Sequence, residues 1–118
     1  MELFEAAQHG KSEILKKIIE AEVDINVSDN EGKTALIWAA SNGQTTCTQL
    51  LVDARADLEM KSQSGWSALL WAAFGDHPTC LKILVEAKAN LESVDLVHKT
   101  ALNWADLRGQ TECARMLI

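Results

Sequence analysis

The chain has 118 residues, enough for one domain, and its 17 acidic and 11 basic residues give a net charge of −6. This acidic balance argues against a nucleic-acid partner, because neutralising phosphates requires an excess of Lys and Arg. No apolar run approaches the length of a membrane-spanning helix, and the N-terminus lacks the basic-then-apolar pattern of a signal peptide. We therefore expect no membrane contact and a cytoplasmic or nuclear location.

The first 28 residues carry an irregular version of a pattern that returns later in the chain. Their apolar residues lie 33 residues before equivalent apolar residues, and Glu5 stands where the later units have Trp. A polar residue at that position suits a unit with no neighbour on its outer side. The regular version is a fourteen-residue segment that occurs at 34–47, 67–80 and 100–113. A fixed period of this length is typical of a stacked array of small units.

Each unit predicts two short helices. Leu36, Ala39 and Ala40 have helical spacing, and so do the apolar residues that follow Cys47. Thr34, Ser67 and Thr100 precede the first helix as capping hydroxyls do, and Gly43 and Gly109 separate the two helices. Pro78 is expected in the first turn of its helix. The predicted helices span 2–9, 12–21, 34–42, 45–54, 67–74, 78–87, 100–107 and 111–118.

A polar segment follows the second helix of each unit and predicts a turn that links it to the next unit. Ala56-Asp57-Leu58 begins one such segment, and a Gly or His98 lies near its end. Asp76 and His98 occupy positions where the neighbouring units have Gly. We expect modest strain at both residues if the backbone there is left-handed.

The segment Gly-x-Thr-Ala-Leu-x-x-Ala-Ala-x-x-Gly at 32–43, the period of 33 and the Ala-Asp-Leu finger together resemble the ankyrin repeat. The resemblance covers nearly the whole chain and implies an all-α ankyrin-repeat solenoid of helix-turn-helix pairs linked by hairpin-like fingers. It implies one domain, 1–118, with repeats at about 2–28, 29–61, 62–94 and 95–118. The family's Thr-Pro-Leu-His reads Thr-Ala-Leu-Ile, Ser-Ala-Leu-Leu and Thr-Ala-Leu-Asn here, which affects the hydrogen bonds of the fingers but not the fold.

The cysteines recur once per unit, but their spacing does not favour a metal site or a disulfide. Equivalent residues of stacked helices lie about 8–10 Å apart, whereas a disulfide needs Cα atoms within about 7 Å and a zinc ion holds sulfur at about 2.3 Å. Ile14 fills the same position in the first unit. We therefore predict thiols that are buried, reduced and free of metal at Cys47, Cys80 and Cys113.

No catalytic residues, metal ligands or cofactor site are predicted. His9, His77 and His98 lie in different units and are interpreted as solvated loop residues. Trp38, Trp71 and Trp104 occupy a position that faces the core, where they contribute buried area. Since no set of titratable groups converges, we expect no enzyme activity.

In the ankyrin family, partners usually bind the concave side formed by the fingers and the first helices. The resemblance therefore implies a partner-binding site on repeats 2–4, where an exposed apolar cluster would mark an interface. Trp66 should project away from the helices and border a groove with Phe74, and the basic residues should lie along its rim. The site residues that we predict are Lys33, Asn42, Trp66, Phe74, Val97, Lys99, Leu107 and Arg108.

The function predicted from these features is a non-catalytic module that binds a protein segment with apolar anchors and some acidic residues. One alternative is an N-terminal targeting or regulatory fragment of a larger enzyme or channel. A weaker alternative is a self-assembling structural protein. We expect a monomer. The competing explanation of the apolar cluster is that a second copy of the chain covers it through repeats 3 and 4, or that residues beyond Ile118 do.

Overall fold

The computed structural model describes residues 2–118, so that Met1 of the predicted domain lies outside the described residues. Eight helices form four helix-turn-helix pairs within that range. Every predicted helix is confirmed, with ends that differ by at most one residue. The pairs are α1 (Glu2–Gln8) with α2 (Ser12–Glu20), α3 (Ala35–Ser41) with α4 (Thr45–Asp53), α5 (Ala68–Phe74) with α6 (Pro78–Glu86), and α7 (Ala101–Leu107) with α8 (Thr111–Leu117).

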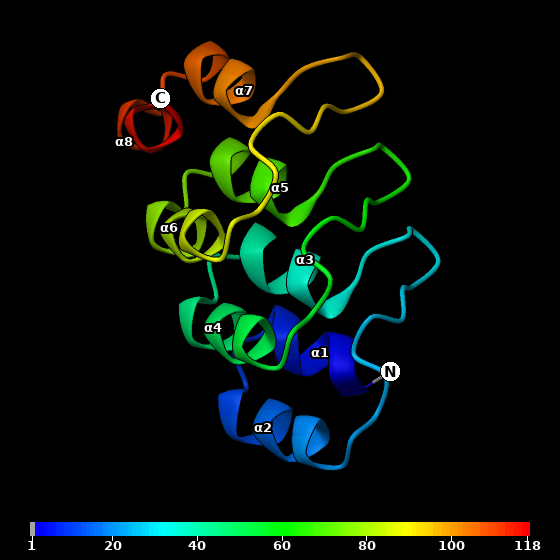
Figure 1. Cartoon of the computed structure of the whole chain (residues 1–118). Coiled ribbons are helices and arrows are strands. Elements are labelled where there is room, and N and C mark those ends of the chain that lie inside the picture. Colours follow the sequence, from blue (N-terminus) through cyan, green and yellow to red (C-terminus); the bar gives the residue numbers. More distant parts are fainter. Residues whose placement is uncertain (1) are drawn as a thin grey trace.

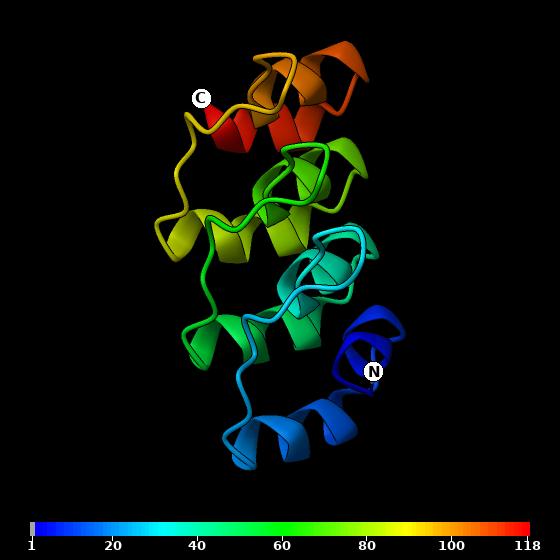
Figure 2. The same ribbon diagram turned by 90° about the vertical axis from the view of Figure 1, so that its right-hand side faces the viewer.

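The pairs stack in chain order along the long axis of a molecule that measures 39 × 24 × 22 Å. The first helices α1, α3, α5 and α7 form one column, the second helices form the other, and the fingers project beside the first column (Figure 1). Figure 2 shows that successive fingers lie above one another on the same side. In residues 2–118 the only β pairing is an isolated bridge between Ser28 and Thr34. The predicted all-α solenoid is therefore confirmed.

The sequence accounts for the starts of three helices. The hydroxyl oxygens of Thr34 and Thr100 accept hydrogen bonds from the backbone N–H of Ile37 and Asn103. Pro78 lies in the first turn of α6, as predicted. Ser67 also precedes its helix, but its side chain makes no capping hydrogen bond, so the prediction of a capping hydroxyl is wrong at this residue.

The turns contain the left-handed residues that the aligned glycines predicted. Gly43 and Gly109 both have a φ of 69°. Asp76 and His98 replace glycine in the equivalent turns and have φ values of 59° and 63°. The predicted left-handed backbone is confirmed at both residues, and each carries the Cβ strain that glycine avoids.

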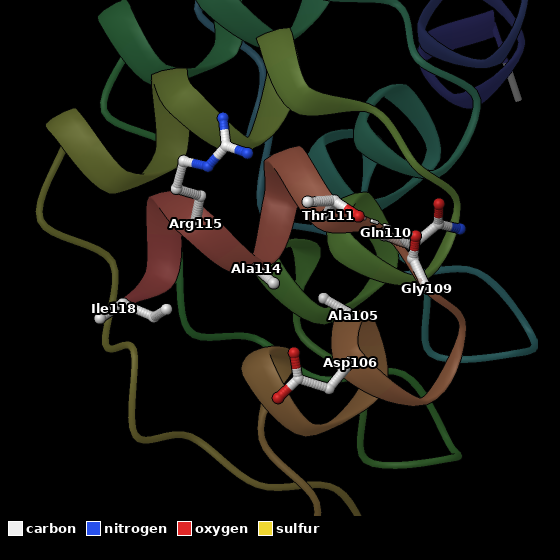
Figure 3. Close-up of a pocket in the computed structure, with 8 residues that line it drawn as sticks. All are labelled: Ala105, Asp106, Gly109, Gln110, Thr111, Ala114, Arg115 and Ile118. Atoms are coloured by element: carbon white, nitrogen blue, oxygen red, sulfur yellow. Dashed lines mark hydrogen bonds between the residues drawn. The ribbon is translucent and has the colours of Figure 1, made fainter.

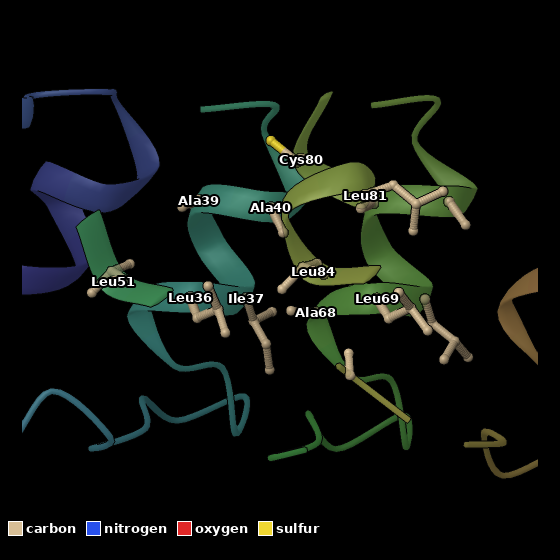
Figure 4. Packing of buried hydrophobic residues seen from close by; sticks show 14 of the residues in the cluster. Leu36, Ile37, Ala39, Ala40, Leu51, Ala68, Leu69, Cys80, Leu81 and Leu84 are labelled. Carbon is tan, nitrogen blue, oxygen red and sulfur yellow. The ribbon is translucent and has the colours of Figure 1, made fainter. Parts of the chain in front are cut away.

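The core runs through the whole stack between the two columns of helices. Its large side chains, including Leu36, Leu51, Leu69, Leu81 and Leu84, are fully buried (Figure 4). Buried alanines of the first helices keep side-chain bulk low where one repeat packs on the next. Since each helix has only seven to nine residues, stability has to come from this stacking rather than from the isolated helices.

The three cysteines are buried, as predicted, because each faces the preceding repeat. Cys47 Sγ lies 3.8 Å from the carbonyl oxygen of Ala6, and Thr48 Oγ1 lies 3.6 Å from Cys80 Sγ. Ile14 occupies the equivalent position in the first repeat but is 39% exposed, since no repeat in the described residues packs on that side of it. The thiol position is therefore a packing position between repeats.

The interpretation of His77 as a solvated loop residue is wrong. His77 is half-buried, and because a carbonyl only accepts, its Nε2 donates to the Ser41 oxygen at 3.1 Å. Gln44 and Gln110 hold the same position and donate to the carbonyl oxygens of Gln8 and Phe74. These bonds satisfy carbonyl groups at the C-terminal ends of three first helices, which lack an intrahelical partner. His9 and His98 are exposed, as expected.

Candidate protein-binding surface

Two aspartates organise the fingers of repeats 2 and 4. The Asp29 carboxylate accepts hydrogen bonds from the backbone N–H of Glu31 and Lys33 and from the indole N–H of Trp38, each at 2.9 Å. Asp95, two repeats later in the chain, has the same arrangement. It accepts from the backbone N–H of Val97 and Lys99, both at 3.0 Å, and from the indole of Trp104 at 2.8 Å. Each carboxylate therefore fixes a finger to a tryptophan of the following helix.

Asp95 also accepts a hydrogen bond from the Trp66 indole at 2.9 Å, which ties the third finger to the fourth. Burial raises the pKa of Asp95, but the hydrogen bonds from the Lys99 backbone, the Trp104 indole, the Val97 backbone and the Trp66 indole outweigh that effect and hold it below its ordinary value. The pKa of Asp29 is lowered by the same balance, in which burial opposes its hydrogen bonds and the Lys33 ammonium adds to them. Both side chains are therefore charged at neutral pH.

Four aromatic rings form a cluster across repeats 3 and 4. The Trp66 ring centroid lies 4.7 Å from that of Trp71, 4.9 Å from that of Phe74 and 5.3 Å from that of Trp104. Phe74 and Trp104 meet edge to face at 5.6 Å. These separations are those of favourable aromatic pairs. We call Trp66, Trp71, Phe74 and Trp104 the aromatic cluster.

The predicted orientation of Trp66 is therefore wrong. Its ring does not project away from the helices but lies half-buried against residues of α5 and α7. The predicted proximity of Trp66 to Phe74 is confirmed by their 4.9 Å centroid distance. Trp38, Trp71 and Trp104 are also half-buried, so they line the edge of the core rather than its centre.

The predicted rim cations lie on aromatic rings. Lys33 Nζ is 4.3 Å from the centroid of Trp38 and 4.7 Å from that of Trp71, and it pairs with Glu31 at 3.3 Å. Lys99 Nζ is 6.0 Å from the Trp104 centroid, and the Arg108 guanidinium carbon is 4.1 Å from that of Phe74. These are cation–π distances. The cations thus cover the rings in addition to lining the surface.

The other predicted site residues lie on the exposed surface. Asn42 is exposed at the end of α3, where its side chain donates to the Trp38 carbonyl oxygen. Val97 and Leu107 are 61% and 64% exposed, and Leu96 beside them is 71% exposed. Val97 and Leu107 line a shallow open depression of about 400 Å³ with His98, Lys99, Asn103 and Asp106. The exposed apolar side chains of the predicted set are therefore confined to repeat 4, and we call Leu96, Val97 and Leu107 the apolar patch.

A second depression, of about 330 Å³, lies on the outer side of α7 and α8 (Figure 3). Ala105, Ala114 and Ile118 line it together with polar residues. Asp106 and Ile118 are exposed here, whereas Ala73 and Ala40, which correspond to Asp106 in the preceding repeats, are fully buried beneath the next repeat. This depression is therefore the stacking face of the last repeat, separate from the apolar patch.

The sequence analysis did not identify Asp29 and Asp95 as residues of this surface. A signal was present, because each lies nine residues before a tryptophan. Ser62 lies nine residues before Trp71 and breaks the pattern. Among residues 2–118, no group of three or more His, Cys, Asp or Glu side chains has an arrangement that could hold a metal ion. None of the helices described is long and apolar enough to cross a membrane.

Comparison with known proteins gives one family match. The family model for ankyrin repeats, which contains three copies of the repeat, matches residues 3–95 and 54–118. No curated protein matches the chain significantly. The matched residues cover nearly all of the sequence and coincide with the four helix pairs described above. The chain therefore belongs to the ankyrin repeat family.

Proposed function

We propose that this chain is a non-catalytic module that binds a segment of another protein on the concave face of repeats 2–4. Ankyrin repeats are generally protein–protein interaction modules, which supports the class of function. The observation that supports this location of the binding site is the apolar patch of repeat 4, beside the aromatic cluster. Its side chains are more than half exposed and contribute little to the core of the chain.

The chemistry of the surface supports a segment with apolar anchors and a few acidic residues. Apolar side chains that lose water at the centre of an interface contribute most of the binding energy. Lys99 lines the same depression as Val97 and Leu107, and Arg108 follows Leu107 in the sequence and lies over the Phe74 ring. Both supply positive charge in a chain of net charge −6. Such charges mainly set the association rate and its salt dependence. A cytoplasmic or nuclear location remains part of the same proposal.

The test compares partners captured by the wild type and by surface variants. Leu107→Ser should lose the partner, with an affinity reduced by about 2 kcal/mol, the magnitude of a hot spot. Leu107 is largely exposed, so the urea midpoint of this variant should stay close to that of the wild type. Trp66→Ala is a poorer probe, because Trp66 is part of the aromatic cluster and its loss would also weaken the fold.

Glu20→Ala, at the end of α2, is the matched control, because Glu20 is exposed and distant in sequence from repeats 3 and 4. Proteins identified by mass spectrometry should be those that bind the wild type and Glu20→Ala but not Leu107→Ser. A partner that binds Leu107→Ser as tightly as the wild type, and Glu20→Ala more weakly, would place the binding site on the second helices.

A further inference from the structure

The third finger lacks the carboxylate that the second and fourth fingers share. Asp29 and Asp95 each collect two backbone N–H groups and one indole N–H. The equivalent residue of the third finger is Ser62, whose Oγ lies 2.9 Å from Ser64 Oγ. The corresponding donors are the backbone N–H groups of Ser64 and Trp66 and the indole of Trp71. In residues 2–118 no acceptor is found for any of them.

The Trp71 indole nitrogen is the most informative of these donors, because it is buried and has no partner. A buried N–H without an acceptor is unfavourable and rare in native proteins. Trp38 and Trp104 occupy the same position in their repeats and both donate to a carboxylate. The Trp71 indole therefore lacks an acceptor because residue 62 is Ser and not Asp, while the tryptophan position itself is the same in all three repeats.

The surface in front of these donors is open. Ser62, Ser64 and Trp71 line a depression of about 320 Å³ together with Glu31, Lys33 and Gln63. Lys33 Nζ lies 4.7 Å from the centroid of the Trp71 ring and places a positive charge over that ring. The lining of the depression beside Trp71 includes the short hydroxyl side chains of Ser62 and Ser64 and the flexible Lys33, which can change rotamer when a ligand enters.

We propose that this depression binds the carboxylate of an Asp or Glu side chain of the bound protein segment. The carboxylate takes the place that Asp29 and Asp95 hold in the neighbouring fingers, accepts from the Trp71 indole and pairs with Lys33. Lys33 exchanges its present partner Glu31, which is exposed, for the ligand. This inference rests on the proposed function and adds one specific contact to it.

The overall charge of the chain limits the proposal to a single carboxylate. A long acidic tract would be repelled by the net charge of −6 and by Glu31 at the edge of the depression. One carboxylate among apolar residues suits both the depression and the nearby aromatic cluster. A neutral amide oxygen can also accept from the Trp71 indole but forms no ion pair with Lys33, so the depression should favour a carboxylate over an amide.

The experiment follows the indole N–H signals of the four tryptophans by ¹⁵N–¹H NMR, with the Trp71 signal assigned from its loss in Trp71→Phe. The probes are a short blocked peptide with one Glu between leucines, its Gln analogue, and sodium acetate at matched ionic strength. The Glu peptide should shift the Trp71 signal to saturation, and the Gln analogue should bind about tenfold more weakly or not at all.

Ser62→Asp supplies the missing carboxylate from the chain itself and is the decisive variant. It should move the Trp71 signal without any ligand, raise the urea midpoint and abolish the response to the Glu peptide. Ser62→Ala keeps the depression open, so it should respond to the Glu peptide as the wild type does. Because Ser62→Asp is expected to stabilise the fold, its loss of binding cannot be attributed to unfolding.

Any one of four results would overturn the inference. If neither the Glu peptide nor acetate shifts the Trp71 signal, or if the Glu peptide still shifts it in Ser62→Asp, then no carboxylate site exists there. If acetate shifts the signal but the Glu peptide does not, the site accepts only a small free carboxylate. A captured partner that needs Leu107 but binds Ser62→Asp as tightly as the wild type would refute this inference and leave the proposed function intact.

Discussion

Trp38, Trp71 and Trp104 occupy one position of successive repeats, yet only two of them have a hydrogen-bond acceptor. Trp38 and Trp104 donate to Asp29 and Asp95, while the Trp71 indole has none. Hydrogen bonds to a charged group stabilise a fold more than neutral ones do. A single exchange of Asp for Ser at residue 62 thus makes one tryptophan energetically different from its equivalents.

This difference predicts unequal effects of the same substitution. Trp38→Phe should lower the free energy of unfolding by about 1–2 kcal/mol more than Trp71→Phe, because it removes a charged hydrogen bond as well as ring area. Trp71→Phe removes ring area but also removes an unpaired buried N–H. Urea titration followed by circular dichroism measures the loss of unfolding free energy in each of the two variants. Equal losses would mean that the Trp71 indole has an acceptor, such as a bound water.

At the scale of the element, a backbone hydrogen bond closes each finger, as from Asp29 N–H to the Lys33 carbonyl oxygen, and side chains attach the fingers to the helices. Asp95 joins three segments, since it accepts from the backbone of its own finger, from Trp104 of α7 and from Trp66 of the preceding finger. The departure from the family's Thr-Pro-Leu-His is compatible with this arrangement, because an indole from the first helix reaches the finger carboxylate instead. The aspartates are therefore the main link between the fingers and the helices.

The lowered pKa of Asp95 predicts a pH dependence of stability. The carboxyl has its ordinary pKa of about 3.9 in the unfolded chain and a lower one in the folded protein. Its stabilising contribution is therefore fully present above about pH 4 and is lost as the pH falls through the folded pKa. Asp95→Asn should be about 2 kcal/mol less stable than the wild type at neutral pH.

The quantity to measure is the difference in urea midpoint between the wild type and Asp95→Asn, because other carboxyl groups also titrate in this pH range. Urea midpoints between pH 7 and pH 2.5 should show a constant gap down to about pH 4 and a narrowing gap below it. Glu59→Gln is a suitable control, since Glu59 is an exposed carboxylate whose oxygen accepts from the Asn90 backbone. A gap that stays constant to the lowest pH would show that the charge of Asp95 does not matter.

At the scale of the whole molecule, the period of 33 residues made the fold predictable, because it specifies where each helix begins and which faces stack. The surface was less predictable for a physical reason. Alignment of Lys33, Trp66 and Lys99 at one position gives no information about what each side chain contacts in the next repeat. Lys33 lies over two rings, and Trp66 packs into the aromatic cluster. Such contacts depend on the distance between repeats and not on the repeat pattern.

The stack also predicts an order in which the molecule opens. Each repeat packs on its neighbours in the stack, so within this chain the first and last repeats are held on one side and the two inner repeats on both sides. The buried cysteines report on this order, because they face the interfaces between repeats and react only when those interfaces open. Burial and the nearby Asp76 raise the pKa of Cys113 to about 11, so its native thiol is nearly unreactive at neutral pH.

Alkylation by N-ethylmaleimide under native conditions should therefore modify Cys47 and Cys113 before Cys80, with each site quantified by peptide mass spectrometry. Cys47 and Cys113 face the interfaces of the first and last repeats, whereas Cys80 faces the interface between the two inner repeats. The expected cause is opening of a terminal helix pair, α1 with α2 or α7 with α8, while the inner repeats stay folded. In concentrated urea the three rates should become similar, which controls for local differences in reactivity. Leu117→Ala, which removes a buried side chain of the last helix, should accelerate Cys113 more than Cys47. Equal rates for all three thiols in the native protein would instead mean that the four repeats unfold as one cooperative unit.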